Sequence, residues 1–134
     1  MRSPRILFAA PSSGSGKTTV VCGVLRAFKN RGKTVSAFKC GPDYIDPLFH
    51  ERVVGVQSGT LDLFFSDETQ LIRLFLQNVN GADCAVVEGV MGYYDGLSAA
   101  RDEASTYAVA KTLRSPVVLI IDSRGQSLSA LATL

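Results

Sequence analysis

The chain has 134 residues, of which 46% are hydrophobic and 19% are charged. This length and composition predict one compact domain and exclude a disordered protein. The formal net charge is only +2 and the basic residues are scattered, which argues against a nucleic-acid partner. No segment approaches the roughly 20 apolar residues of a membrane helix, and the apolar run near the N-terminus is too short for a signal peptide. We therefore expect a cytoplasmic protein with no membrane partner.

A predicted strand over residues 5–10 leads into the sequence APSSGSGKTTV (10–20), and apolar residues at helical spacing follow. This order is typical of a phosphate-binding loop, in which backbone N–H groups and a helix N-terminus face the phosphate. Lys17 would reach the β- and γ-phosphates, and the Thr18 hydroxyl would ligate Mg²⁺. The residues expected to hold a nucleotide are Ser13, Gly14, Ser15, Gly16, Lys17, Thr18 and Thr19. Pro11 replaces the first glycine of the Walker A pattern, so the alternative is an ordinary Gly/Ser turn before a helix.

A helix is predicted over 17–31, and a strand over 33–39 is expected beside the first strand. Two prolines follow within FKCGPDYIDPLFH (38–50), so we expect Asp43 and Asp46 on a constrained loop at the carboxyl edge of a parallel sheet. Each aspartate alone is explained by turn capping, whereas the pair beside a phosphate site favours Mg²⁺ coordination. Lys39 is either a ligand for a phosphate or carboxylate, or a solvated surface lysine.

The next helix is predicted to start at residues 66–69 and to end near residue 78. Asp62, just before it, is assigned a capping role in preference to a place in the cleft. A buried strand over 84–87 then ends in Glu88, within the sequence DCAVVEGVMGYY (83–94). A carboxylate buried at a strand end without a partner is costly, which indicates metal or phosphate chemistry for Glu88. The glycine-rich loop 89–96 leaves room for a bound molecule, although Asp95-Gly96 alone is explained by a tight turn.

The remaining elements are a helix over 103–114, a buried strand over 116–121 and a final helix from residue 125. Strands that alternate with helices predict an α/β fold with a mostly parallel sheet flanked by helices, and the chain is expected to be an incomplete fragment. The three cysteines, Cys22, Cys40 and Cys84, form no metal or disulfide pattern, so we interpret them as packing residues. A nucleophilic Cys40 is conceivable, but His50 is the only histidine and no second base is evident.

The stretches APSSGSGKTT, FKCGPDYIDPLFH, VVEGVMGYYDG and SPVVLIIDSRGQSLSA resemble the cobyrinic acid a,c-diamide synthase family. This family belongs to the ATP-dependent amidoligases of the dethiobiotin synthetase group, which have a P-loop NTPase-like fold. The resemblance covers essentially all 134 residues and accounts for Pro11, because the group does not keep the first Walker glycine. It implies an N-terminal ATP-binding synthetase domain (residues 1–134) whose C-terminal glutaminase domain is absent.

The resemblance also implies a reaction. ATP would phosphorylate the a and c side-chain carboxylates of a corrinoid, and ammonia taken from glutamine by the glutaminase domain would displace the phosphate to leave an amide. ATP and Mg²⁺ are the expected cofactors, and the resemblance is compatible with a homodimer. The implied catalytic residues are Lys17, Asp43, Asp46 and Glu88; the metal-side groups are Thr18, Asp46 and Glu88; and the substrate-facing residues are Lys39, Tyr44, Ile45 and Asp95.

Three alternatives remain at this point, one of which is a non-catalytic nucleotide-binding module. Amidases for related tetrapyrroles, such as hydrogenobyrinic acid or nickel-sirohydrochlorin, share the motifs too closely to be separated from the family above. A regulatory P-loop ATPase of the partitioning type is the rival from another class, and Ser12 counts against it because those proteins carry a signature lysine there.

Overall fold

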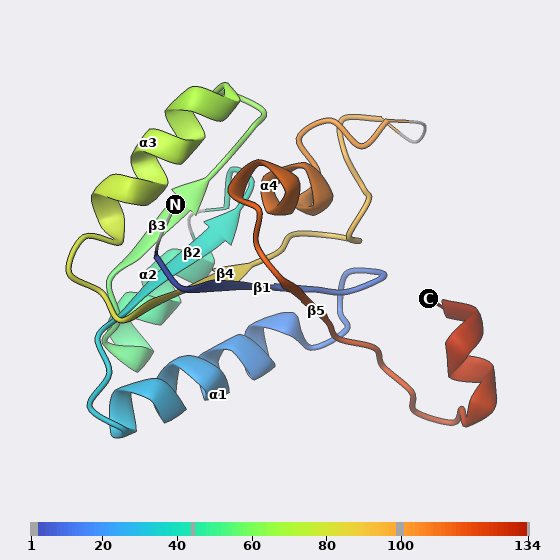
Figure 1. Cartoon of the computed structure of the whole chain (residues 1–134). Coiled ribbons are helices and arrows are strands. Elements are labelled where there is room, and N and C mark those ends of the chain that lie inside the picture. The colour runs from blue at the N-terminus through green and yellow to red at the C-terminus, as the bar shows by residue number, and fades with distance from the viewer. Residues whose placement is uncertain (1–2, 44, 99–100, 134) are drawn as a thin grey trace.

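A computed structural model describes residues 3–43, 45–98 and 101–133, apart from the side chain of Asp46. In this described part, parallel strands form one sheet in the order β3-β2-β4-β1-β5 (Figure 1). The strands are β1 (Arg5–Ala9), β2 (Val35–Cys40), β3 (Ser58–Leu61), β4 (Cys84–Glu88) and β5 (Val117–Leu119). The helices are α1 (Lys17–Asn30), α2 (Ile45–Phe49), the π-helix η1 (His50–Val54), α3 (Glu68–Asn78), α4 (Thr106–Leu113) and the 3-10 helix η2 (Leu128–Thr133).

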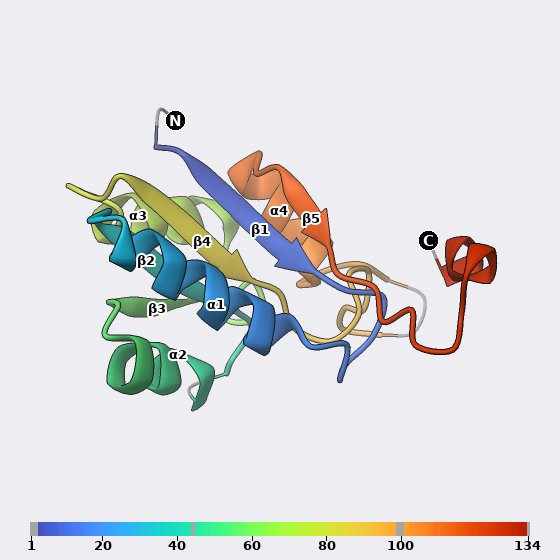
Figure 2. The ribbon, with the colours of Figure 1, turned by 90° about the horizontal axis from the view of Figure 1, so that it is seen from below.

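The central strands bury both faces, because alternate side chains enter two different hydrophobic clusters. On one face α3 and α4 cover the sheet, with Phe75 and Leu113 packed against strand residues such as Phe38. On the other face α1 and the end of η1 cover the sheet, with Val21 and Val54 as their buried contacts. In Figure 2, which is seen from below, α1 lies in front of the strands. The predicted α/β class with a parallel sheet is confirmed.

The predicted position of the second strand is wrong in one respect. The strand over 33–39 was expected beside the first, but β2 pairs with β3 and β4, and β4 lies between β2 and β1. The structure also contains β3, for which no strand was predicted. The sequence SGTL has little β propensity, and β3 is a short strand at the edge of the sheet.

The expectation of a constrained loop at Asp46 is also wrong, because residues 45–49 form the short helix α2. Pro47 lies in its first turn, where a backbone N–H has no helical partner to lose. The predictions for the last strand and the last helix need smaller corrections. The expected buried strand is β5, which is a half-exposed edge strand, and the expected helix from residue 125 is a turn followed by the 3-10 helix η2. No helix within the described ranges is long and apolar enough to cross a membrane.

Candidate phosphate-binding site

The loop between β1 and α1 leaves a helix N-terminus open. Gly14 and Gly16 have φ values of 76° and 88°, a left-handed conformation that favours glycine. No side chain caps α1, and its first turn contains no acidic residue. By contrast, Asp67 caps α3 and Ser105 caps α4 through their side chains. The N-terminus of α1 therefore has no side-chain cap at Gly16, as the phosphate-loop interpretation requires.

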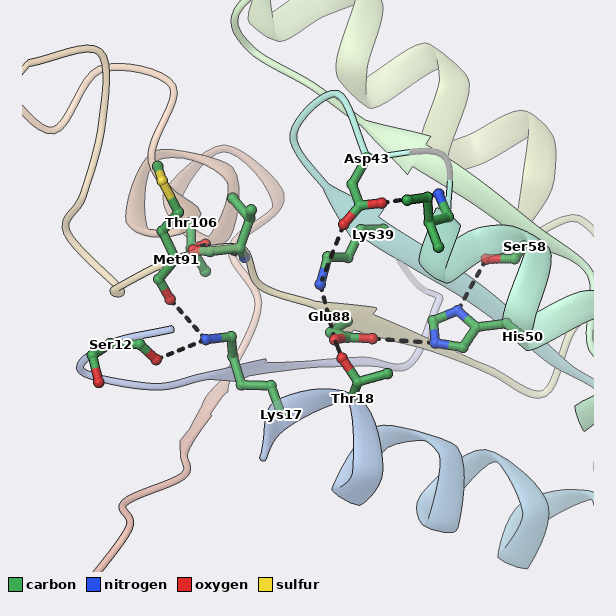
Figure 3. A network of polar contacts seen from close by, with 12 residues as sticks. Ser12, Lys17, Thr18, Lys39, Asp43, His50, Ser58, Glu88, Met91 and Thr106 are labelled. Atoms are coloured by element: carbon green, nitrogen blue, oxygen red, sulfur yellow. Dashed lines mark hydrogen bonds and ion pairs between the residues drawn. The ribbon is translucent and has the colours of Figure 1, made fainter. Parts of the chain in front are cut away.

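Lys17 adds a buried positive charge next to this N-terminus. The residue is 7% exposed, and its Nζ donates to the backbone oxygens of Ser12 (3.1 Å) and Met91 (2.7 Å) (Figure 3). Burial, and next the ammonium of Lys39, lower the pKa of Lys17. An anionic ligand would offset both effects.

Glu88 ends β4 at the centre of the site and is fully buried. The parallel register places Lys39 of β2 directly opposite it, so both side chains point to the sheet face that α1 covers. Lys39 Nζ lies 2.9 Å from Glu88 Oε1, and the Thr18 hydroxyl donates to the same oxygen. Lys39 is only 4% exposed, which rules out the surface-lysine alternative.

His50 approaches the other oxygen of Glu88. Its Nε2 lies 3.1 Å from Glu88 Oε2, and its Nδ1 lies 3.2 Å from the Ser58 hydroxyl (Figure 3). The His50–Glu88 pair is close but poorly aligned, since neither Nε2 nor Oε2 meets hydrogen-bond geometry with any described group. Sequence reasoning missed His50 as a site residue, although it ends the FKCGPDYIDPLFH stretch and is the only histidine.

The surroundings keep Glu88 ionised. Burial on its own raises the pKa of this carboxyl, but its contacts with His50 and Lys39, together with the Thr18 hydroxyl, outweigh burial. The net result is a pKa below the ordinary value. Burial has the opposite outcome at Cys40, where it raises the thiol pKa to about 12 and supports the packing interpretation of this residue.

Two cavities adjoin each other at the carboxyl ends of the strands. The first, of about 380 Å³, is lined by the phosphate loop together with Lys17, Lys39 and Glu88. The second, of about 730 Å³, is mostly apolar and is lined by the loops after β2, β3 and β4. The two cavities share Asp43, Val90 and Met91 in their walls. A charged molecule in the first cavity would therefore lie next to an apolar molecule in the second.

Asp43 lies between the two cavities. Its Oδ1 accepts the N–H of Ile45 at 3.0 Å, so it does cap a turn as one alternative held. Its Oδ2 lies 4.0 Å from Lys39 Nζ. Asp62 caps a turn in the same way, by accepting the N–H of Phe64 at 2.7 Å, and its side chain reaches the wall of the apolar cavity.

The other predicted residues are distributed as follows. Ser13 and Thr19 line the phosphate cavity, whereas Ser15 bonds to the Ser12 carbonyl and lines a separate hollow beside residues 121–124. Ile45 is 79% exposed and lines the apolar cavity. Asp95 accepts the N–H of Gly92 at 2.9 Å, as a turn residue would, and lines a further cavity with Met91 and Gly96. Tyr44 and the side chain of Asp46 lie outside the described part of the chain.

The donors present suit a magnesium ion. The Thr18 hydroxyl and Glu88 are hard oxygen donors, and Mg²⁺ usually takes few protein ligands and completes its shell with phosphate oxygens and water. The Thr18 hydroxyl donates to Glu88 Oε1, and both residues line the phosphate cavity, so the two donors are already side by side. Within the described residues, no cluster of His, Cys, Asp or Glu forms a metal site by itself. A metal at Thr18 and Glu88 would therefore depend on the nucleotide for further ligands.

Both the sequence and the fold of the chain are similar to those of known proteins. A family model described as "CobQ/CobB/MinD/ParA nucleotide binding domain" matches residues 6–129. The chain is 48% identical to a cobyrinate a,c-diamide synthase of Listeria innocua and 50% identical to a hydrogenobyrinate a,c-diamide synthase of Streptomyces coelicolor, each over 129 residues. Each alignment covers 96% of this chain, but the chain spans only 28% and 26% of those relatives.

Solved structures with a similar fold include two FtsY proteins, of which the first is described as a signal recognition particle receptor. FtsY from Elizabethkingia anophelis superposes with a TM-score of 0.68 at 17% identity, over 98% of this chain and 46% of that one. Chloroplast FtsY from Physcomitrella patens gives 0.66 at 17% identity, over 99% and 45%. At this identity the likeness concerns the fold alone.

Proposed function

Because this chain belongs to the CobQ/CobB/MinD/ParA nucleotide binding domain family, we propose that it is the ATP-binding synthetase part of a corrinoid a,c-diamide synthase. Such an enzyme would act in cobalamin biosynthesis as an ATP-dependent carbon–nitrogen ligase. The names of the Listeria and Streptomyces relatives support a corrinoid as the substrate. The two relatives differ in identity by only 2 percentage points, 50% against 48%, so cobyrinate and hydrogenobyrinate are both retained as acceptors.

The observation that carries the proposal is the pair of joined cavities. A triphosphate fits the chemistry of the smaller cavity, with its open helix N-terminus and two buried lysines, Lys17 and Lys39. A macrocycle fits the larger, mostly apolar cavity of about 730 Å³. The shared wall at Asp43 would bring a carboxylate at the rim of the macrocycle next to the γ-phosphate. A regulatory ATPase needs no such acceptor cavity.

The proposed chemistry has two steps. An oxygen of the acceptor carboxylate attacks the γ-phosphorus, and the bond from that phosphorus to the leaving ADP oxygen breaks. Ammonia then attacks the acyl carbon, phosphate leaves, and the nitrogen loses a proton to give the amide. Residues 14–19 would hold the triphosphate, and Lys17 would neutralise charge on its β- and γ-phosphates. Asp43 would lie beside the γ-phosphate.

Magnesium would be held by Thr18 and Glu88, with Asp46 as the third metal-side residue carried over from the resemblance. When bound, it would supply positive charge to the phosphate oxygens during transfer. The chain's own contribution is to keep Glu88 ionised beside the phosphate cavity. The low pKa of Glu88 supports this role, since a protonated carboxyl is a poor metal ligand.

The acceptor side is assigned to Lys39, Tyr44, Ile45 and Asp95. Ile45 supports this assignment through its exposed place on the wall of the apolar cavity. Ammonia would come from glutamine in a glutaminase domain elsewhere in the full-length protein, and the 134 residues alone would not use glutamine. A cytoplasmic location and a homodimer are the further parts of this proposal.

The proposal is tested with Glu88→Gln and Asp46→Asn in the full-length protein. Positional isotope exchange within ATP reports reversible transfer of the γ-phosphate to the acceptor. We expect both variants to lose this exchange in the presence of cobyrinate or hydrogenobyrinate, and to keep most of the ATP affinity that is measured without Mg²⁺. Glu68→Gln, at an exposed site on α3, is the matched control and should exchange like the wild type.

Unchanged exchange in both variants would refute the residue assignment. ATP turnover by the wild type that is the same with and without a tetrapyrrole carboxylate would refute the amidoligase function. That second result would favour the regulatory ATPase.

A further inference from the structure

His50 is buried beside Glu88, yet nothing in the proposed chemistry uses it. The side chain has no exposed surface, and its Nε2 faces Glu88, whose side chain lies on the face of the sheet that α1 covers. It begins η1, a π-helix, and such irregular turns are frequent at functional sites. A histidine that served only to fill the core would not need a carboxylate oxygen 3.1 Å from its Nε2.

The segment that carries His50 is fastened to α1. Arg26 donates to the Val53 carbonyl at 2.8 Å, and Lys29 donates to the carbonyls of Val54 and Gly55 at 3.1 and 3.0 Å. The same helix begins with the phosphate loop and carries Thr18 near its start. The backbone of η1 and the phosphate loop are therefore positioned by one rigid element.

The two oxygens of Glu88 have different neighbours. Oε1 contacts Thr18 and Lys39, while Oε2 is next to His50 alone among the described groups. The Ser58 hydroxyl, which rotates freely, can donate to Nδ1 of His50 at 3.2 Å. That bond leaves the proton of a neutral imidazole on Nε2, facing Oε2.

We propose that His50 is a positioning residue that holds the carboxylate of Glu88, through Nε2–H and Oε2, so that Oε1 stays directed at Thr18 and at a magnesium ion bound with the nucleotide. This inference rests on the proposed function for the metal. Residues that orient a metal ligand in this way commonly contribute a factor of 10–100 in metal affinity or activity. His50 has no contact with the phosphates in this proposal.

The test measures nucleotide affinity and needs no turnover. Isothermal titration of the full-length protein with a non-hydrolysable ATP analogue is done once with Mg²⁺ and once with EDTA. We expect His50→Leu to lose about tenfold of the affinity gained from Mg²⁺ and to keep the affinity measured in EDTA. His50→Gln, whose amide N–H reaches the place of Nε2, should recover most of that gain.

Ser36→Ala is the control, because its hydroxyl is also buried but bonds to the Asn78 carbonyl away from the site. It should leave both affinities unchanged. If His50→Leu does not fold, His50→Asn takes its place, since asparagine keeps a polar group near Ser58 and removes the donor from Oε2. Either variant should show the same selective loss.

The proposal is wrong if the loss is equal in Mg²⁺ and EDTA, if the gain from Mg²⁺ is unchanged, or if His50→Gln behaves like His50→Leu. It is also wrong if the wild type gains no affinity from Mg²⁺. If the wild type gains nucleotide affinity from Mg²⁺ but never amidates a corrinoid, the proposed function is wrong. The titrations of the His50 variants then still decide whether His50 positions Glu88.

Discussion

Replacing Lys39 by methionine removes an ammonium from the interior and leaves the carboxylate of Glu88 buried without the lysine that pairs with it. Lys39 Nζ and Glu88 Oε1 are 2.9 Å apart, and the two residues are 4% and 0% exposed. At an effective dielectric constant of about 20 their attraction is roughly 6 kcal/mol, and the cost of removing both charges from water offsets much of it.

Breaking one partner of a buried pair typically costs about 3–5 kcal/mol of unfolding free energy. We expect Lys39→Met to lie near 3 kcal/mol, roughly the low end of that range, because Thr18 and His50 still contact the carboxylate. Glu88→Gln should cost somewhat less, since Asp43 remains 4.0 Å from Lys39. The double variant should cost clearly less than the two together, with a coupling energy of about 2 kcal/mol.

Urea unfolding followed by circular dichroism, without nucleotide or metal, measures this double-mutant cycle. The exposed pair of Lys33 and Asp83, whose closest atoms are 3.4 Å apart, provides the control cycle and should show no measurable coupling. If the Lys39 and Glu88 variants are additive within about 0.5 kcal/mol, the buried pair does not stabilise the fold in the way argued from its geometry.

Two further predictions concern the loops and the core around the site. A Cβ at Gly92 would lie 2.6 Å from the Pro11 carbonyl and 2.5 Å from Asp95 Oδ2, so Gly92→Ala should cost about 1–3 kcal/mol and lower the Tm. Gly23→Ala is the control, because a Cβ at this position in α1 meets nothing within 4 Å, and it should leave the Tm unchanged or raise it. Equal changes of Tm in the two variants would contradict the close approach of Gly92 to Pro11 and Asp95. Because the Cys40 pKa is about 12, its thiol should resist iodoacetamide at pH 8 in the native protein and react in urea; rapid native labelling detected by mass spectrometry would contradict its burial.

The parts of the site that were predictable lie within single local patterns. A strand, a glycine turn and a helix are contiguous in the sequence, so Lys17 and Thr18 could be assigned from spacing alone. Glu88 could be assigned because it directly follows an apolar run typical of a buried strand. All three residues lie at the carboxyl ends of the strands, as expected, and in the wall of one cavity.

The parts that were missed depend on packing between distant segments. Pro47 is compatible with a helix only when it lies in the first turn, and the sequence does not show where α2 starts. Two prolines close together therefore favoured the prediction of a loop. Strand order does not follow from chain order, so β4 could not be placed between β1 and β2. His50 meets Glu88 only because η1 folds back across the sheet, and no spacing in the sequence contains that contact.

The strand order has a consequence for how the protein folds. The wall of the phosphate cavity needs β1, β2 and β4 side by side, and the pairing of β1 with β4 joins residues as distant as Arg5 and Ala85. Such long-range pairing is slow to form, because the intervening chain must be closed into a loop before the contact is made. The glycine loop and α1 are local and can form early, but Lys39 and Glu88 reach the cavity only when β2 and β4 have paired. We therefore expect tight nucleotide binding to arise late in folding. Because the nucleotide would bind only the complete sheet, it would shift the folding equilibrium toward the native state.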